Sequence, residues 1–324
     1  VLVLTERRLL DPAYWSEVLN ASVISCRAEK LDRGFSPSAI HRLHLEYASS
    51  SAGAAPSIIC KDSLAPWSDT DPDGLHREWF VYSECLSALS TVGPDLLHSE
   101  HSSQANRLVI ADLDIDHYFL PVQHVWSREE LRPTLETLAL LHLSAESLPL
   151  EKYPLLMPAP DRRWESDIIQ RAVRSLVDDR TYASQGRRLL PVVELLLKRM
   201  ADQFDVWQQV SRTLLHSDFN CSNVALERTG EAPARLIDWH IAASGMAAFE
   251  IASIFFQPHH NHRNLERRAV LGDYLEARHR LSGNLLHPDD EWDSFCYATA
   301  ANGLSYLPPV ARQLQATGSL QGWW

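Results

Sequence analysis

Three polar side chains in the second half of the sequence have the types and spacing that phosphoryl transfer requires. Asp218 lies five residues before Asn223 in a polar loop between a predicted helix and a predicted strand, and Asp238 ends a short strand further on. Transfer of a phosphoryl group needs a carboxylate that accepts the proton of the attacking hydroxyl, and oxygen donors that hold Mg²⁺ against the phosphates. Asp218 is the candidate for the first role, and Asn223 and Asp238 are the candidates for the second.

A further pair of charged residues stands in the first third of the sequence. Lys61 ends the apolar run Ser57–Cys60, and Glu78 lies on the next predicted helix, whose apolar stripe begins with Trp79 and Tyr82. A lysine at the end of an apolar strand needs a carboxylate partner to hold it in place. The sequence therefore predicts an ion pair between Lys61 and Glu78.

The elements that must position these residues change in character along the chain. The first third is rich in short extended segments, including a predicted hairpin of Ala39–Tyr47 with Ser57–Lys61. From Ser127 the pattern is helical, and Ser127 with Glu130 forms a capping-box signature. The later predictions are helices at Leu75–Ser90, Glu165–Val177, Arg187–Gln203 and Phe204–Leu214, extended segments at Arg107–Leu113, Asn223–Leu226 and Arg235–Asp238, and helices from Ala247 onward.

This order of elements predicts an α+β protein of two lobes. Residues 1–112 form a small β-rich lobe and residues 113–324 a larger, mostly helical lobe, with the join near Ala111–Asp114. A length of 324 residues is about twice that of a usual domain and fits two lobes.

The composition excludes several classes of protein. A net charge of −12 argues against binding a nucleic-acid backbone by bulk charge. The apolar run Val1–Leu4 is too short for a secretory signal or a membrane span, and the five widely spaced cysteines fit neither a disulfide framework nor a zinc ribbon. We therefore expect a cytoplasmic protein that binds neither nucleic acid nor membrane. The glycine-rich dinucleotide fingerprint, the P-loop and the hydrolase nucleophile elbow are also absent from the sequence.

The motif His216-x-Asp218-x-x-x-x-Asn223, followed by Ile237-Asp238-Trp239, resembles the catalytic and metal-binding motifs of the aminoglycoside phosphotransferase and choline kinase superfamily. That superfamily has the protein-kinase-like fold. Ser217 stands where the family usually has glycine, and Glu250 where aspartate is commoner. The resemblance extends from about Arg27 to Ala252. It includes Pro56–Lys61, Arg77–Tyr82 and Arg107–Leu113 and is closest to the ecdysteroid-kinase-like branch.

The resemblance implies a role for each candidate residue. MgATP, with GTP as an alternative nucleotide, is expected between the lobes, under a phosphate-covering loop at Leu31–Ser36 that has a single glycine. The expected roles are Asp218 as the catalytic base, His216 as structural support of its loop, Asn223 and Asp238 as Mg²⁺ ligands, Lys61 as the ligand of the α- and β-phosphates, Glu78 as its partner, and Ala111 and Leu113 as the hinge backbone that binds the purine.

The predicted function is that of an ATP-dependent small-molecule kinase, a phosphotransferase with an alcohol group as acceptor. The acceptor stays open among antibiotics, amino alcohols, sugars, nucleosides and steroid-like alcohols, because fold-level kinship does not choose among them. The alternative is a catalytically inactive, kinase-like nucleotide-binding or scaffold protein, which would account for Ser217 and the glycine-poor loop. A protein kinase is disfavoured, because D-F-G and A-P-E motifs are missing. The expected assembly is a monomer or homodimer.

Overall fold

The chain folds into two compact units, each built from segments that are separated in the sequence. Unit 1 comprises Val1–Leu120, Pro154–Leu156 and Asn223–Ala242, and unit 2 comprises Pro121–Tyr153, Met157–Ser222 and Ala243–Trp324. The structure is a computed structural model that describes residues 6–31, 39–48, 55–64, 74–86, 91–102, 105–113, 118–120, 126–158, 166–207, 209–230, 232–256 and 265–317. The predicted phosphate-covering loop lies outside these residues except for Leu31.

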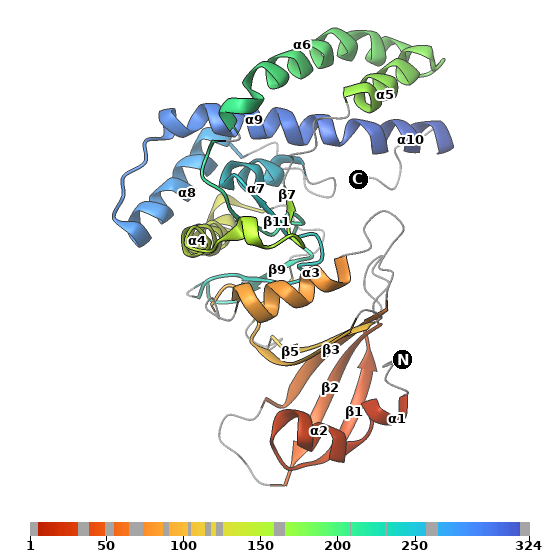
Figure 1. Cartoon of the computed structure of the whole chain (residues 1–324), viewed down its shortest axis with the longest axis vertical. Helices are drawn as coiled ribbons and strands as arrows, with labels where there is room; N and C mark the ends of the chain where they lie inside the picture. The colour runs from red at the N-terminus through yellow and green to blue at the C-terminus, as the bar shows by residue number, and fades with distance from the viewer. Residues whose placement is uncertain are drawn as a thin grey trace. The chain divides into compact units, whose positions relative to one another are not determined.

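Unit 1 is built on a five-stranded antiparallel sheet in the order β1-β2-β3-β5-β4 (Figure 1). The predicted hairpin is confirmed, because β2 and β3 pair antiparallel with Ile40 opposite Lys61. The strand β1 and the helices α1 and α2, which come before this hairpin, were missed from the sequence. The bounds are α1 Glu6–Leu9, α2 Pro12–Leu19, β1 Val23–Lys30, β2 Ala39–Tyr47, β3 Ser57–Leu64, β4 Leu96–His101 and β5 Ala105–Ala111.

The two faces of this sheet have different roles. Because side chains alternate along a strand, Ile58 and Cys60 of β3 point to one face and Ser57, Ile59 and Lys61 to the other. Ile58 and Cys60 belong to a core cluster that contains Trp15 of α2, so that α2 covers their face. Helix α3, Gly74–Phe80, lies on the Lys61 face, as the contact of its Glu78 with Lys61 requires (Figure 1).

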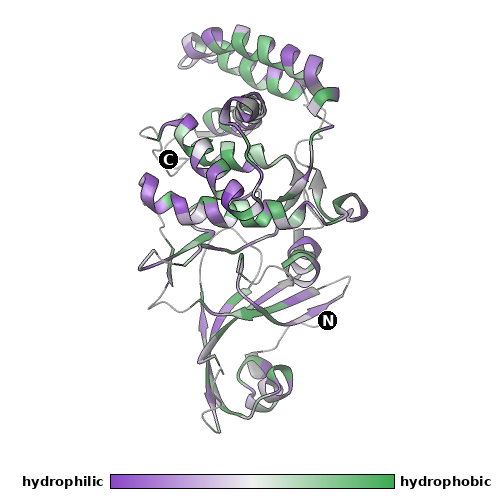
Figure 2. Cartoon of the chain, turned by 90° about the vertical axis from the view of Figure 1, so that its left-hand side faces the viewer, coloured by the Kyte–Doolittle hydropathy of each residue, from purple (hydrophilic) through white to green (hydrophobic). Residues whose placement is uncertain are grey.

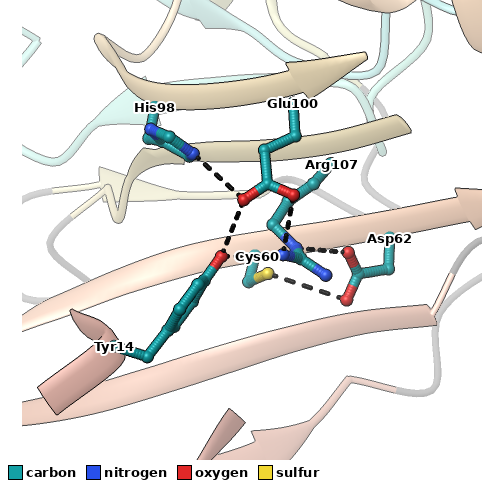
Figure 3. Close-up of polar contacts among 6 residues, drawn as sticks. All are labelled: Tyr14, Cys60, Asp62, His98, Glu100 and Arg107. Carbon is teal, nitrogen blue, oxygen red and sulfur yellow. Dashed lines mark hydrogen bonds and ion pairs between the residues drawn. The ribbon is translucent and has the colours of Figure 1, made fainter. Parts of the chain in front are cut away.

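A buried polar network joins three strands on the face that α2 covers (Figure 3). Arg107 of β5 is 2% exposed and donates from Nε to Asp62 Oδ1 over 2.7 Å, and from Nη1 to Tyr14 Oη over 2.7 Å and to Glu100 Oε2 over 3.2 Å. Tyr14 donates to Glu100 Oε1 over 3.1 Å. Burial, partly offset by the nearby Arg107 guanidinium, raises the pKa of Tyr14 to about 12, so the phenol stays protonated.

Unit 1 also contains a π-helical turn after α3 and a second, smaller sheet. After α3 the chain continues as a π-helical turn, Val81–Cys85, where the sequence predicted one helix over Leu75–Ser90. Residues 87–90 of that helix lie outside the described part. A second small sheet has the order β10-β9-β6, formed by Arg235–Leu236, Val224–Glu227 and Tyr118–Phe119. The two predicted strands after Asn223 therefore exist and pair antiparallel.

Unit 2 is mainly helical around a small sheet in the order β7-β11-β8. Its helices carry both hydrophobic and hydrophilic residues, as amphipathic helices do (Figure 2). The bounds are α4 Arg128–Ala145, a 3₁₀ turn Leu150–Lys152, β7 Met157–Pro158, α5 Ser166–Asp178, α6 Ala183–Trp207, β8 Thr213–Leu215, β11 Ala243–Gly245, α7 Ala247–Ser253, a 3₁₀ turn Ile254–Phe256, α8 Arg267–Ser282, α9 Pro288–Ser305 and α10 Leu307–Thr317.

Two of the helix predictions in unit 2 have clear outcomes. The capping box is confirmed, because Ser127 accepts a hydrogen bond from the Glu130 amide and Glu130 accepts one from the Ser127 amide. The separate helix predicted over Phe204–Leu214 is wrong. Helix α6 continues without a break to Trp207, and Thr213–Leu215 is a strand that pairs with β11. The strand has only three residues and forms by pairing with the distant β11, which the local pattern of the sequence does not encode.

The predicted α+β class is confirmed, since unit 1 is built on an antiparallel sheet and unit 2 is mainly helical. Within the described residues, every helix is either too short or too polar to cross a membrane.

We expect Arg107→Met to lower the free energy of unfolding by about 3 kcal/mol, because it leaves the buried Asp62 carboxylate without its guanidinium partner. The matched control is Arg280→Met, which removes the ion pairs of Arg280 with Glu136 and Glu276, all about half exposed or more. That loss should stay below about 1 kcal/mol. Urea denaturation of both variants measures the difference, and equal losses would contradict a structural role for the network.

Candidate active site

The centre of the site in unit 1 is a lysine held between two carboxylates. Lys61 Nζ lies 2.6 Å from Glu78 Oε2 and 2.6 Å from Asp238 Oδ1. Only 9% of the lysine side chain is exposed, and only 5% of that of Glu78. The ion pair expected between Lys61 and Glu78 is therefore present, and the structure adds Asp238 to it.

The charges of this cluster stabilise one another. Burial alone would lower the pKa of Lys61, but the Glu78 and Asp238 carboxylates outweigh it and the pKa is raised. Burial would raise the pKa of Asp238, but the Lys61 ammonium and the hydrogen bond from His240 Nδ1, over 3.1 Å, hold it well below its usual range. Lys61 is therefore a cation and Asp238 an anion at neutral pH.

The backbone around Asp238 is unusual and is fixed from both sides. Asp238 has φ +69°, a left-handed conformation that aspartate tolerates better than most residues do. Just before it, the Ile237 amide donates to the Asn223 carbonyl over 2.9 Å, and the Leu236 amide donates to the Val92 carbonyl over 2.8 Å. The strand can lie this close because of Gly93, where a Cβ would stand 3.3 Å from the Leu236 carbonyl oxygen.

Asn223 is brought to the same part of unit 1 as Asp238 by this backbone hydrogen bond. Asn223 is 6% exposed, and its carbonyl receives the Ile237 amide. The two residues predicted as Mg²⁺ ligands thus lie on adjacent segments at the start of β9 and just after β10.

Arg77, the neighbour of Glu78 on α3, is a site residue to which the sequence assigned no role. It is 3% exposed and donates from Nε to the Leu155 carbonyl over 2.7 Å, and from Nη1 to the His240 carbonyl over 2.5 Å. One helix therefore carries both the partner of Lys61 and the residue that holds the backbone after Asp238.

The predicted hinge residues stand at the end of β5. Ala111 is the last residue of β5, opposite Ile58 of β3, and its amide donates to the Asp95 carbonyl over 2.8 Å. Leu113 follows two residues later. Between them the Asp112 carboxylate accepts hydrogen bonds from Arg42 and Ser57.

In unit 2 a buried carboxylate holds the loop that carries Asp218. Glu250 of α7 accepts the His216 amide at Oε2 and the Ser217 amide at Oε1, each over 2.8 Å. Ser217 has φ +66°, a conformation that glycine adopts without strain and serine does not. The two hydrogen bonds to Glu250 fix the backbone at this point and so offset the strain.

Glu250 is in turn contacted by a buried histidine. His142 Nε2 lies 3.4 Å from Glu250 Oε2, and its Nδ1 lies 2.8 Å from the Tyr274 hydroxyl. Burial would raise the pKa of Glu250, but the hydrogen bond and charge of His142, the charge of His216 and the backbone bond lower it. Glu250 is therefore ionised, which strengthens its bonds to the two amides.

Asp218 lies half-buried in this loop, between the buried His216 and the buried Phe219. Asn220 Nδ2 donates to the Asp218 carbonyl over 3.0 Å and to its Oδ1 over 3.1 Å. Phe219 packs edge-on against Trp126 at 5.9 Å between ring centroids. The pKa of Tyr306 is raised by burial and, second, by the Asp218 charge. The carboxylate is thus oriented by its own loop and partly open to solvent.

The structure places the predicted site residues in two groups, one in each unit. Lys61, Glu78, Asp238 and Asn223 belong to unit 1, and His216 and Asp218 to unit 2. No pattern in the sequence indicated the contacts of Arg77 and His240. It did single out Glu250 as a departure from the motif, and that departure marked a structural residue.

A family model described as "Phosphotransferase enzyme family" matches residues 112–291, which is more than half of the chain. The family model and the fold identify a kinase-like phosphotransferase, and the chain belongs to this family. The membership predicted from the motifs around Asp218 and Asp238 is confirmed. No curated protein matches the sequence.

Two similar solved structures share the fold at low sequence identity. One is the GDP complex of wild-type aminoglycoside 2′-phosphotransferase-IIIa, with 12% identity, 97% of this chain and 94% of that chain covered, and a TM-score of 0.59. The other is the GDP and kanamycin complex of APH(2″)-IIia, with 12% identity, 97% and 95% covered, and a TM-score of 0.58. At this identity the likeness establishes the fold.

We expect Glu250→Gln to lower the free energy of unfolding at pH 7 by about 2 kcal/mol, because glutamine has one acceptor oxygen and would leave either the His216 or the Ser217 amide facing an NH₂ group. Because the pKa of Glu250 is lower in the folded protein than its value of 4.5 in the unfolded chain, the ionised carboxylate stabilises the fold at pH values above 4.5. This stabilisation is lost as the pH falls below 4.5 and through the pKa of the folded protein. The difference between wild type and variant should therefore shrink on acidification below pH 4.5.

Thermal unfolding from pH 7 to pH 3.5 measures this difference. The exposed Glu194→Gln is the matched control and should show no pH-dependent difference. A difference for Glu250→Gln that stays constant with pH would contradict an ionised Glu250.

Proposed function

We propose that the protein is an ATP-dependent small-molecule kinase that transfers the γ-phosphate of ATP to a hydroxyl group of a small-molecule acceptor. The observation that carries this proposal is Lys61 held at 2.6 Å by both Glu78 and Asp238. One carboxylate would neutralise a buried lysine. The second carboxylate is therefore more than charge balance requires. Family membership supports the same chemistry.

In this proposal the nucleotide is bound by residues of unit 1. Lys61 contacts the α- and β-phosphates, and Glu78 keeps its ammonium in place. The purine meets the backbone after β5. Because the Ala111 amide already donates to Asp95, Ala111 offers its carbonyl and Leu113 its amide, an acceptor and a donor on one side of an extended segment. This pair complements the amino group and ring nitrogen of adenine, and GTP is the alternative to test.

The donor set of Asn223 and Asp238 fits Mg²⁺. A carboxylate and a carboxamide offer hard oxygen ligands, and Mg²⁺ usually takes one or two protein oxygens together with phosphate oxygens and water. Within the described residues, no group of three or more His, Cys, Asp or Glu side chains is placed to hold a metal ion among them. When bound, Mg²⁺ would neutralise charge on the phosphates.

Asp218 is the proposed catalytic base. Its carboxylate, oriented by Asn220, accepts the proton of the acceptor hydroxyl as the oxygen attacks the γ-phosphate in line. His216 and Glu250 hold the backbone of its loop, so that the carboxylate needs little reorganisation before reaction.

The acceptor is proposed only as a class. One of the similar structures contains kanamycin, and aminoglycosides and amino alcohols are cationic acceptors that an acidic protein attracts. Sugars, nucleosides, macrolides and steroid-like alcohols belong to the same screen. The second candidate is a catalytically inactive nucleotide-binding or scaffold protein, which the strained Ser217 would suit. It would bind nucleotide without turnover.

The first test is thermal unfolding of the wild type and of Asp238→Ala with and without MgATP, and with MgGTP in parallel. Nucleotide at a hundredfold excess over its Kd should add about 2.7 kcal/mol of stability to the wild type. The shift should need Mg²⁺ and should be lost in Asp238→Ala. Absence of a shift with either nucleotide would overturn the kinase proposal.

The second test measures ADP release with a panel of hydroxyl acceptors. Asp218→Asn should reduce turnover about 10²–10⁴-fold, the contribution typical of a general base, while the nucleotide-dependent thermal shift is kept. Asp202→Asn, an exposed aspartate on α6, is the matched control and should keep full activity. Full activity of Asp218→Asn would exclude Asp218 as the base, and nucleotide binding without turnover of any acceptor would favour the scaffold.

A further inference from the structure

The residue between the two proposed hinge positions carries a nearly buried carboxylate with three hydrogen bonds. The Asp112 side chain is 6% exposed. Its Oδ2 accepts from Arg42 Nε over 2.7 Å and from Ser57 Oγ over 2.7 Å, and its Oδ1 accepts from Arg42 Nη2 over 3.3 Å. Asp112, Arg42 and Ser57 are called the Asp112 clamp below.

The clamp begins where the backbone pairing of the sheet ends. The last pair between β3 and β5 is Ile58 with Ala111, and on the other side the Ala111 amide donates to Asp95. Asp112 lies one residue beyond this ladder, and side-chain bonds to β2 and β3 replace the backbone bonds. The chain is therefore held on both sides at Ala111 and, from the side of β2 and β3, also at Asp112, the residue that precedes Leu113.

The clamp lies on the same face of the sheet as Lys61. Ser57 and Lys61 are both on β3 and four residues apart, so they point to one face at a separation of about 13 Å. The core beneath α2 is on the opposite face and includes Ile58 and Cys60. The charged pair of Arg42 and Asp112 thus lies outside that core, at the end of β3 away from the lysine.

Lys61 and the hinge lie at opposite ends of one face of β3, as the phosphates and the base lie at opposite ends of a nucleoside triphosphate. A nucleotide whose phosphates lie at Lys61 and whose base lies at the hinge would follow the face of β3 from one end to the other. Hydrogen bonds weaken steeply when they are misaligned, so a base read by backbone groups needs a backbone that does not move. Arg42, which is 22% exposed, reaches across β3 from β2 to fix that backbone.

We propose that the Asp112 clamp positions the backbone of Ala111–Leu113 for binding of the purine base, with Arg42, Ser57 and Asp112 as positioning residues. The inference rests on the proposed function, because it needs a nucleotide bound at this face. According to the inference, the affinity for the base depends on the side chains of the Asp112 clamp, although these do not touch the nucleotide. The affinity for the triphosphate group does not depend on the clamp.

The test compares MgATP with Mg²⁺-tripolyphosphate, which has the phosphates without the base, by isothermal titration calorimetry. Arg42→Met should weaken MgATP about tenfold, the effect of removing a hydrogen bond to a charged group, and leave tripolyphosphate binding unchanged. Arg42→Lys keeps the charge but cannot donate from two nitrogens, and should restore part of the affinity. Asp112→Asn should behave like Arg42→Met.

Controls separate the clamp from the proposed function. Glu29→Gln removes a carboxylate that is 4.0 Å from Arg42 Nη1 and 47% exposed, and should leave both affinities unchanged. Lys61→Met should lose both ligands. Unchanged MgATP affinity in Arg42→Met and Asp112→Asn, or an equal loss of both ligands, would overturn the clamp alone. A wild type that binds neither ligand would overturn the proposed function and the clamp with it.

Discussion

A lysine ammonium removed from water must be held by negative charge, and much of unit 1 serves to bring that charge to Lys61. The lysine comes from β3, Glu78 from α3, and Asp238 from a segment more than 170 residues further along the chain. The segment that carries Asp238 is itself supported by Arg77, by the Val92 and Asn223 carbonyls and by the close approach that Gly93 allows. Removal of one member of such a cluster leaves an uncompensated buried charge. A change that displaces the supporting segment would therefore have the same cost as removal of the carboxylate that it carries.

Unit 2 contains a buried carboxylate, and backbone amides stabilise it where unit 1 uses a lysine side chain. Glu250 is buried, and two amides of the Asp218 loop and His142 surround it. In one unit a buried cation gathers carboxylates, and in the other a buried carboxylate gathers donors. In both, a residue in the left-handed conformation, Asp238 or Ser217, stands beside the charged group. Strain of this kind persists only where surrounding contacts determine the backbone.

The parts that could be predicted from the sequence are those encoded by neighbouring residues. The hairpin of β2 and β3 follows from alternation, the start of α4 from Ser127 and Glu130, and the pairing of Lys61 with Glu78 from the need of a buried cation. What was missed depends on distant contacts. The three-residue β8 forms by pairing with β11, which also pairs with β7, and the predicted helix ended at Gln203 although α6 continues to Trp207. The bonds of Asp112 to two other strands had no local signal either.

The way Glu250 binds the Asp218 loop gives that loop its own reporters of motion. The His216 and Ser217 amides donate to a carboxylate on a helix, not to a neighbouring carbonyl, so their protons stay protected from solvent only while loop and helix remain docked. Local openings of this kind occur at lower free energies than global unfolding. Hydrogen exchange at these two adjacent amides would therefore follow the docking of the loop separately from the unfolding of unit 2. An acceptor that closes on Asp218 would register as slower exchange at positions it never touches.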